Sequence, residues 1–319
     1  MISVLRQALR YVLLTTTVLF LSACDYSDGE VLNDVGTFSG EYERPALNVK
    51  PGVTVYDNQE VTAGGSLNLV WSDEFDGDTL DLNTWLVQTG DGTDFGLPSG
   101  WGNNELQYYQ AENAVVTNGL LTITARQESV GGLNYTSARI TTADLVAFRY
   151  GRIEARMKLP GGQGLWPAFW LLSQDSPYGT WAATGEIDVM EATNLGGSGG
   201  NSVFGTIHYG GEFPANTFTG IRTTVATDAT TDFHDYAIEW DADEMRWYVD
   251  DVLYATQNSW WSDASTTSPD AAYPAPFNQS FHILLNAAVG GNLPGPPDGS
   301  TVFPVTMEVD WVRVYEGGP

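Results

Sequence analysis

The chain has 319 residues, of which 40 are acidic and 13 are basic, so its formal net charge at pH 7 is −27. A surface this acidic repels nucleic acid and anionic lipid, and it suits a neutral partner. The single cysteine excludes an intramolecular disulfide. Apolar residues make up 42% of the chain, and the composition of 11 Trp, 15 Tyr, 13 Phe and 35 Gly favours an all-β sandwich or barrel.

The first 24 residues are typical of an export signal. Arg6 and Arg10 precede the apolar run YVLLTTTVLFLSAC, which is too short for a secure membrane span. Its ending, LSAC, resembles the lipobox of bacterial lipoproteins, which implies that Cys24 is lipidated and becomes the first mature residue. An ordinary signal peptide with an incidental cysteine is the alternative. The lipid would hold the protein in a bacterial cell envelope, periplasmic or at the surface, as its one contact with a membrane.

Residues 25–65 are polar, acidic and weakly periodic, which predicts a tether leading to a domain that spans 66–319. We expect two antiparallel sheets packed face to face, in a monomeric protein. Strands are predicted at 67–77, 120–126, 148–159, 165–172, 185–191, 203–209, 234–240, 245–250, 281–288 and 307–315.

The segment GLWPAFWLL is apolar on both faces of its predicted strand. Phe169 and Leu171 share one face, whereas Trp166 and Trp170 share the opposite one. If the first face packs in the core, the second needs another role. Indole rings stack on the apolar faces of sugars, so the tryptophan pair predicts a carbohydrate-binding surface. A pair packed in the core is the alternative.

Three carboxylates fall within six residues of the segment GEIDVMEATN: Glu186, Asp188 and Glu191. In a regular strand, Glu186 and Asp188 share a face and Glu191 points to the other. One extra residue, inserted as a β-bulge, would rotate Glu191 onto the same face. The two glutamate Cα atoms would then lie roughly 13 Å apart, and leaning side chains would bring the carboxyl groups to about 5–6 Å.

A gap of this size is typical of retaining glycosidases, whose carboxyl groups lie ~5–5.5 Å apart, and it is short for inverting ones. One carboxylate attacks the anomeric carbon, and the other, still protonated, donates to the leaving oxygen. Crowding pushes the proton affinities of the three groups apart, and Asp188 can hydrogen-bond the nucleophile. A solvated acidic strand edge and a Ca²⁺ site are the alternatives.

Further motifs follow one another along the chain in a specific order: WSDEFDG, WGNNELQYY, GRIEARMKLP, GLWPAFWLL, FHDYAIEW, LLNAAVGGNLPG and VDWVRVYE. Together with GEIDVMEATN they resemble glycoside hydrolase family 16, in its variant with a bulged catalytic strand. The resemblance spans most of residues 66–319. It implies a β-jelly roll with a concave substrate cleft that hydrolyses β-linked glucans or galactans with retention. Within the family the chain is most similar to bacterial laminarinases, which are endo-acting on β-1,3-glucan.

By position, the resemblance implies that Glu186 is the nucleophile, Glu191 the acid/base and Asp188 the assisting residue. Trp166 and Trp170 would line the donor subsites.

The resemblance also implies that Asn103 and Arg139 bond sugar hydroxyls, and that His208 lies beside the acid/base and positions it. From the sequence alone, a lone histidine in an apolar strand is more often a structural residue. Asn286 would touch the cleft, and Trp101, in the loop SGWGNNELQYY, would add a further aromatic platform.

Many relatives bind Ca²⁺ on the convex face, and the matching positions here are Glu74 and Gly119, through carbonyls, and Asp310. Oxygen ligands suit this ion, which would tie the first and last strands together. Catalysis itself is expected to need no cofactor. The chain departs from many laminarinases in GGNLPG, where Leu293 replaces an aromatic residue and leaves the exact polysaccharide less defined.

Two other functions compete with a β-1,3-glucanase. A glucan-binding module without turnover is disfavoured because Glu186 and Glu191 are both present. An enzyme for mixed-linkage β-glucan or an agar-type galactan is the second. Sulfated galactans rank lower, because the chain offers few Lys and Arg side chains to hold sulfate esters.

Overall fold

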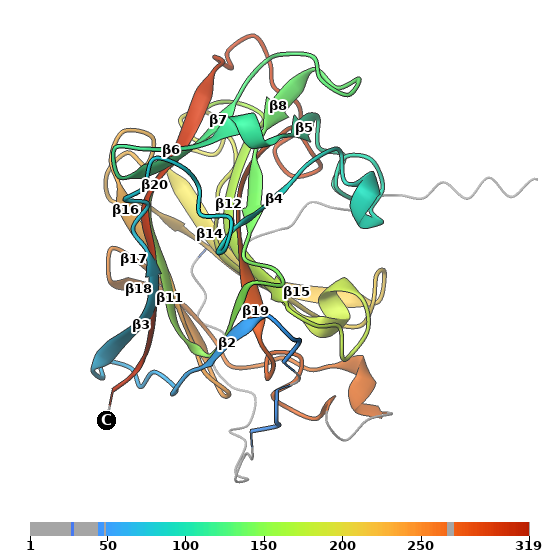
Figure 1. The fold of residues 1–319 in the computed structure, drawn as a ribbon, viewed down its shortest axis with the longest axis vertical. Helices are drawn as coiled ribbons and strands as arrows, with labels where there is room; N and C mark the ends of the chain where they lie inside the picture. Colours follow the sequence, from blue (N-terminus) through green and yellow to red (C-terminus); the bar gives the residue numbers. More distant parts are fainter. Residues whose placement is uncertain (1–26, 29–43, 48, 267–270, 319) are drawn as a thin grey trace, which may run out of the picture.

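The computed structural model describes residues 27–28, 44–47, 49–266 and 271–318, which form a sandwich of two large β-sheets (Figure 1). The first sheet has ten strands. Its main path runs through β1 (Ser27–Asp28), β15 (Asn216–Thr224), β14 (Ser202–Gly210), β13 (Glu186–Glu191), β12 (Leu165–Ser173), β19 (Phe281–Val289), β10 (Val146–Arg149) and β2 (Thr54–Asp57). Two further strands, β9 (Arg139–Thr141) and β4 (Leu86–Gln88), extend it beside β19.

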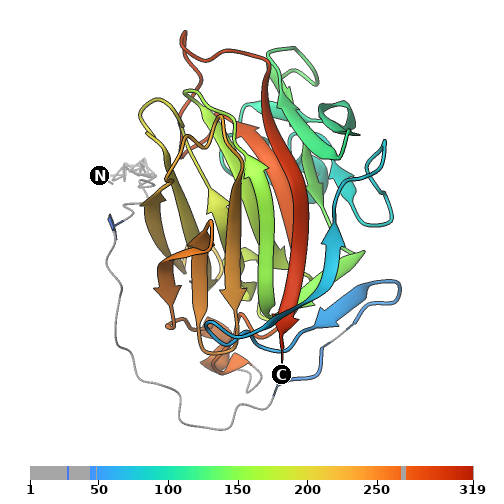
Figure 2. The same ribbon diagram turned by 90° about the vertical axis from the view of Figure 1, so that its left-hand side faces the viewer.

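The second sheet has eight strands, and Figure 2 looks onto it, with the red C-terminal strand running the length of the molecule. Its path runs through β18 (Val252–Gln257), β17 (Met245–Val249), β16 (His234–Trp240), β11 (Gly151–Lys158), β20 (Val305–Gly317), β7 (Leu120–Ala125) and β6 (Ala114–Thr117), and β3 (Leu67–Asp73) pairs with β20. A small sheet joins β5 (Gln107–Tyr109) to β8 (Tyr135–Ser137). The helical segments among the described residues are short 3₁₀ turns: η1 (Thr93–Phe95), η2 (Ala111–Asn113), η3 (Trp181–Thr184) and η4 (Asp263–Thr266).

The predicted all-β sandwich is confirmed, and every predicted strand overlaps an observed one. Pairing is antiparallel throughout both large sheets except where β1 joins β15 and β2 joins β10. The core lies between the sheets, and Phe169 and Leu171 are fully buried in it, as the alternation predicts. Trp166 and Trp170 therefore point to the opposite face of the ten-stranded sheet, where each is only half-buried.

One predicted strand was wrong in its continuity. Residues 148–159 do not form a single strand, because the chain leaves the ten-stranded sheet after β10 and enters the eight-stranded sheet with β11. Tyr150 and Gly151 make this step with positive φ angles of 64° and 105°. A side chain at Gly151 would place its Cβ 2.4 Å from the Tyr315 carbonyl oxygen, so the crossing requires glycine.

The predicted boundary between tether and domain at residue 66 was also wrong. Strand β2 lies at the edge of the ten-stranded sheet, inside the segment predicted to be a tether. The buried guanidinium of Arg149 explains the attachment, because it contacts the Asp57 carboxylate at 2.5 and 2.8 Å and the Pro45 carbonyl at 2.7 Å. The domain therefore starts some twenty residues earlier than its hydrophobic pattern indicates.

The predicted signal segment and Cys24 lie outside the described residues. Within the part of the chain that the structure describes, no helix is long and apolar enough to cross a membrane.

A chain that starts at Ser66 should be less stable than one that starts at Arg44. It loses β2 and strips the buried Arg149 charge of its carboxylate partner, which costs roughly 3–5 kcal/mol of unfolding free energy. Urea unfolding of the two chains measures the difference, and Asp57→Ala in the longer chain should shift stability in the same direction. Equal midpoints for the two chains would show that residues 44–65 are a tether after all.

Candidate active site

Strand β13 carries the three carboxylates and contains the predicted bulge. Its partner β14 pairs with Asp188 at Thr206 and with Glu191 at Phe204, so three steps along β13 match two along β14. The register with β12 shifts at the same place, between Phe169 and Trp170. One extra residue is thus inserted after Asp188, and the prediction of a β-bulge is confirmed.

The bulge separates the strand cleanly into core and site faces. Ile187, Val189 and Met190 all belong to the hydrophobic core, although the last two are adjacent in sequence. Because two successive residues point inward, Glu191 returns to the outer face with Glu186 and Asp188. We call this outer face of the ten-stranded sheet the site face.

The second sheet holds the bulge in place from the other side of the core. The indole Nε1–H of Trp247, on β17, donates to the Asp188 backbone carbonyl at 2.9 Å. Trp247 reaches it because position 205 on β14 is glycine: a Cβ there would lie 2.3 Å from the indole ring. The Asp188 carbonyl is thus hydrogen-bonded although it lies at an irregular point of the strand. Leaving a buried carbonyl without a partner would cost about 1–3 kcal/mol.

Each of the two glutamates accepts a hydrogen bond from a tryptophan. Trp181 Nε1 donates to Glu186 Oε2 at 3.0 Å, and Trp166 Nε1 donates to Glu191 Oε1 at 2.7 Å. Sequence analysis missed Trp181, which lies in the short helix η3 and is 39% exposed. The sequence offered one hint of this contact, an indole five residues before Glu186. Trp181 lies in a turn, however, where no periodic pattern predicts the direction of a side chain.

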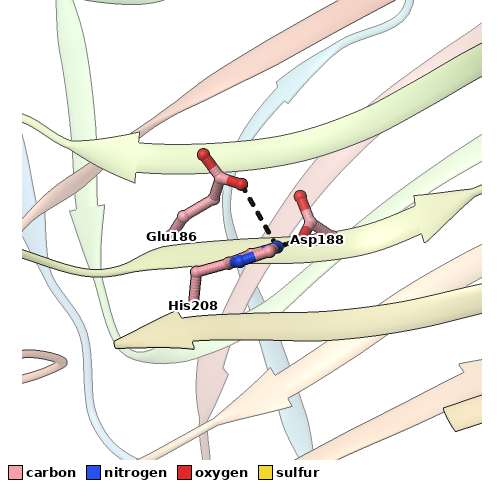
Figure 3. Close-up of side chains that lie close together, drawn as sticks. All are labelled: Glu186, Asp188 and His208. Atoms are coloured by element: carbon pink, nitrogen blue, oxygen red, sulfur yellow. Dashed lines mark ion pairs between the residues drawn. The ribbon is translucent and has the colours of Figure 1, made fainter. Parts of the chain in front are cut away.

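His208 lies beside Glu186 and Asp188, as Figure 3 shows. Its Nε2 atom is 3.6 Å from Glu186 Oε1 and 3.4 Å from Asp188 Oδ2. The expectation that it adjoins the acid/base was wrong, because the antiparallel register sets His208 opposite Glu186, whereas Glu191 pairs with Phe204. The side chain that contacts Glu191 is Trp166.

Burial governs the protonation of the three carboxyl groups. It raises the pKa of Glu186 to about 7, a shift to which the Asp188 charge adds and which His208, the Trp181 hydrogen bond and Arg139 oppose. Burial raises the pKa of Asp188 as well. The pKa of Glu191 lies well above its usual range, first through burial and then through the Asp188 charge. Near neutral pH, Glu191 therefore retains a proton and the raised pKa of Asp188 favours its protonated form too, so Glu186 is the group of the three that can ionise.

A chain of hydrogen bonds fixes Trp170 and Asn286 on the site face. Trp170 Nε1 donates to Asn286 Oδ1 at 2.7 Å, Asn286 Nδ2 to the Tyr109 hydroxyl at 3.2 Å, and that hydroxyl to Glu105 Oε2 at 3.2 Å. An indole can only donate, so each following group is oriented in turn. Sequence analysis missed Glu105, a buried carboxylate that Gln107 also contacts at 2.6 Å.

Arg139 is almost fully buried beside the site, with 7% of its surface exposed. Its guanidinium sits 4.7 Å from the ring centres of both Trp101 and Trp170, and its Nε donates to Gln88 at 2.5 Å. The prediction that Trp101 is an exposed platform was wrong. Trp101 is 4% exposed, because it packs under Arg139 and donates to the Gly90 carbonyl.

Asn103 is exposed, and its backbone oxygen accepts from the Asn292 amide at 2.8 Å. A Cβ at Gly291 would lie within about 3.3 Å of both the Trp166 ring and that same oxygen. Asn103 therefore stands at the Trp166 end of the site face, where its amide also donates to Glu105 at 3.4 Å.

The predicted calcium residues converge through backbone register. Strands β7 and β3 pair with successive stretches of β20, through Val309 and Val312. Glu74 directly follows β3 and Gly119 directly precedes β7, so both meet β20 near Asp310. The Glu74 carboxylate is engaged by Arg313 at 2.8 and 2.9 Å, which leaves its carbonyl for an ion. The Asp310 carboxylate lies 3.5 Å from Arg156. Oxygen ligands of these kinds suit Ca²⁺, and the site stays a prediction.

Comparison with known proteins identifies the family of the chain. The model of the glycosyl hydrolases family 16 matches residues 102–313. The chain belongs to this family. It is 40% identical over 289 residues to a glucan endo-1,3-beta-glucosidase A1 of Niallia circulans, covering 83% of this chain and 41% of that enzyme. It is 41% identical over 278 residues to a beta-glucanase of Rhodothermus marinus, covering 84% and 92%.

Its fold is similar to that of the laminarinase catalytic domain from Thermotoga maritima, with a TM-score of 0.69 and 40% identity. The likeness covers 79% of this chain and 99% of that domain. Family 16 membership confirms the predicted family and jelly-roll fold, and it makes the carboxylates of β13 the catalytic candidates.

Trp247→Phe should impair glycoside hydrolysis more than it impairs folding. It leaves the Asp188 carbonyl unpaired and frees the bulge, so we expect a loss of roughly 1–3 kcal/mol in stability and at least a tenfold lower kcat. Trp240→Phe is the matched control, because that buried indole also donates to a carbonyl, of Phe277, at 3.2 Å. Similar kcat losses in the two variants at matched stability would rule out a special role for the Trp247 contact.

Glu186→Gln should stabilise the protein at alkaline pH and not at acid pH. The folded pKa of Glu186, about 7, exceeds its unfolded value, so between roughly pH 4.5 and 7 the folded state binds more protons. Stability conferred by this carboxyl is therefore lost as pH rises through that window. We expect the variant to gain roughly 1–3 kcal/mol over the parent at pH 8 and little at pH 4.5, by urea unfolding. A variant no more stable than the parent at pH 8 would contradict this electrostatic account.

Proposed function

We propose that this protein is an endo-acting hydrolase of β-1,3-glucan of the laminarin type and that it retains the anomeric configuration. The observation that carries the proposal is the bulged strand β13, which sets Glu186, Asp188 and Glu191 on one face with a proton held at Glu191. The names of the similar proteins, glucan endo-1,3-beta-glucosidase and laminarinase, support the substrate.

The chemistry follows from two glutamates in different protonation states. Glu191 gives its proton to the glycosidic oxygen as that bond breaks, and ionised Glu186 forms a bond to the anomeric carbon. Water then attacks the same carbon, the bond to Glu186 breaks, and Glu191 recovers a proton from the water. The predicted 5–6 Å gap between the two carboxyl groups agrees with this double displacement and stays a prediction.

The tryptophans that contact Glu186 and Glu191 indicate what each end of the site does. Trp181 donates to Glu186 through one carboxylate oxygen and so leaves the other for attack, while Trp166 holds the acid/base. Trp170 presents a fixed indole because Asn286 anchors its N–H. We infer that Trp166 and Trp170 carry the sugar rings on the donor side, with Arg139 and Asn103 bonding hydroxyls at the edge.

Mixed-linkage β-glucan is the second candidate substrate. Leu293 occupies the loop position where many laminarinases have an aromatic residue, and it is half-exposed here. A smaller aliphatic side chain offers one stacking surface fewer, which loosens selection for a single linkage.

Glu186→Gln and Glu191→Gln should each lower laminarin hydrolysis by at least a thousandfold while oligosaccharide binding persists. Reducing-sugar release and calorimetric binding measure the two properties, and proton NMR of the first product reports β configuration if the mechanism retains. Glu308→Gln is a matched control, because that carboxylate pairs with Lys158 on the other sheet. Release from agarose and none from laminarin would overturn the substrate, and hydrolysis by Glu186→Gln would overturn the nucleophile.

Two further features are proposals about the envelope and stability. A lipid on Cys24 would tether the domain to a bacterial membrane, and the mass of the mature N-terminal peptide tests it.

A structural Ca²⁺ at Glu74, Gly119 and Asp310 would join β3, β7 and β20, so chelation should lower the melting temperature. An unchanged melting temperature would dismiss the ion.

A further inference from the structure

The imidazole of His208 and the carboxylates of Glu186 and Asp188 form a compact donor set at the centre of the site face (Figure 3). One ligand atom from each lies within 4.8 Å of the others. His208 Nε2 is 3.4 Å from Asp188 Oδ2 and 3.6 Å from Glu186 Oε1. Ligands at ~2.1 Å from a tetrahedral Zn²⁺ are about 3.4 Å from one another, so two of the three separations suit that geometry.

A second observation points to a ligand. The Asp188 side chain is only 4% exposed, and its Oδ2 atom has no hydrogen-bond partner among the described residues. A buried carboxylate oxygen without a donor is costly, and a cation at this point would satisfy it. A dashed line in Figure 3 joins Asp188 to the His208 ring and marks their ion pair, in which Oδ2 faces His208 Nε2 at 3.4 Å.

We propose that Glu186, Asp188 and His208 bind one borderline divalent cation of the Zn²⁺ class, and that the bound ion blocks the nucleophile. A mixed set of one imidazole and two carboxylates favours Zn²⁺ over Mg²⁺ or Ca²⁺, which prefer oxygen ligands alone. The ion would bind Glu186 through Oε1, because Trp181 holds Oε2. Binding of the ion is independent of the proposed function, whereas the inhibition rests on it.

The ion would be a reversible inhibitor and not a resident cofactor. In tight zinc sites the second ring nitrogen of the histidine donates to a fixed acceptor. His208 Nδ1 is buried and finds no hydrogen-bond partner in the described part of the chain. Access is open, because the side chains of Glu186 and His208 are 12% and 17% exposed, and water can complete the coordination.

Isothermal titration of ZnCl₂ into the full chain tests the site. All proteins carry Cys24→Ser, since the single thiol would bind zinc by itself. We expect one saturable site per chain and at least a tenfold weaker affinity in both His208→Asn and Asp188→Asn, with folding checked by circular dichroism. The matched controls are His234→Asn and His282→Asn, the other two histidines of the sequence, which should stay within threefold of the parent.

Two results would overturn the site: no saturable binding to the parent, or unchanged affinity in both His208→Asn and Asp188→Asn. Loss of binding in His234→Asn would also overturn it, because His234 pairs with Asp250 at 2.6 Å on the other sheet.

Hydrolysis assays test the consequence. Zinc should competitively inhibit the release of reducing sugar from laminarin in the parent, His234→Asn and His282→Asn alike, and a chelator should restore the rate. Inhibition that substrate fails to relieve would overturn the proposed block of the nucleophile. Zinc binding in titration by a protein that hydrolyses no glucan would leave the metal site standing and sink the proposed function.

Discussion

The hydrogen bond from the Trp247 indole to the Asp188 carbonyl joins the two sheets at the irregular point of strand β13. A β-bulge turns a backbone carbonyl out of the ladder, and in a core only a donor from elsewhere can satisfy it. Trp247 supplies that donor across the sandwich, and Gly205 leaves the space for its ring. The direction of Glu191 therefore depends on a residue of the opposite sheet.

Crowding buried carboxylates at this bulge is unfavourable for folding and useful for catalysis. Burial raises the pKa of each of the three groups, so that the site holds protons at a pH where free glutamates have lost them. Each glutamate of the pair also accepts one indole hydrogen bond that opposes this rise, from Trp181 on Glu186 and from Trp166 on Glu191. The crowding of buried carboxyl groups that favours a bound proton would equally favour a bound cation.

A polar network fixes Trp170 on the site face, where we propose that sugars bind. Trp170, Asn286, Tyr109 and Glu105 form one directed chain of hydrogen bonds, in which a buried carboxylate accepts at the end. Beside it, Arg139 is enclosed by two indole rings, where its positive charge lies near the Glu105 carboxylate. Flat aromatic surfaces bind sugars well only if they are preorganised, and this network removes the rotamer freedom of Trp170.

The residue order alone was enough for the sandwich class, the strand positions and the bulge, because period-two alternation and three carboxylates in six residues are local signals. It could not show that His208 faces Glu186, that Trp101 is buried beneath Arg139, or that β2 belongs to the domain. Those facts arise from strand register and from contacts between segments far apart in the chain, such as Trp247 and Asp188, which are 59 residues apart. Local patterns specify which face of a strand a side chain takes; only packing decides which side chain it meets there.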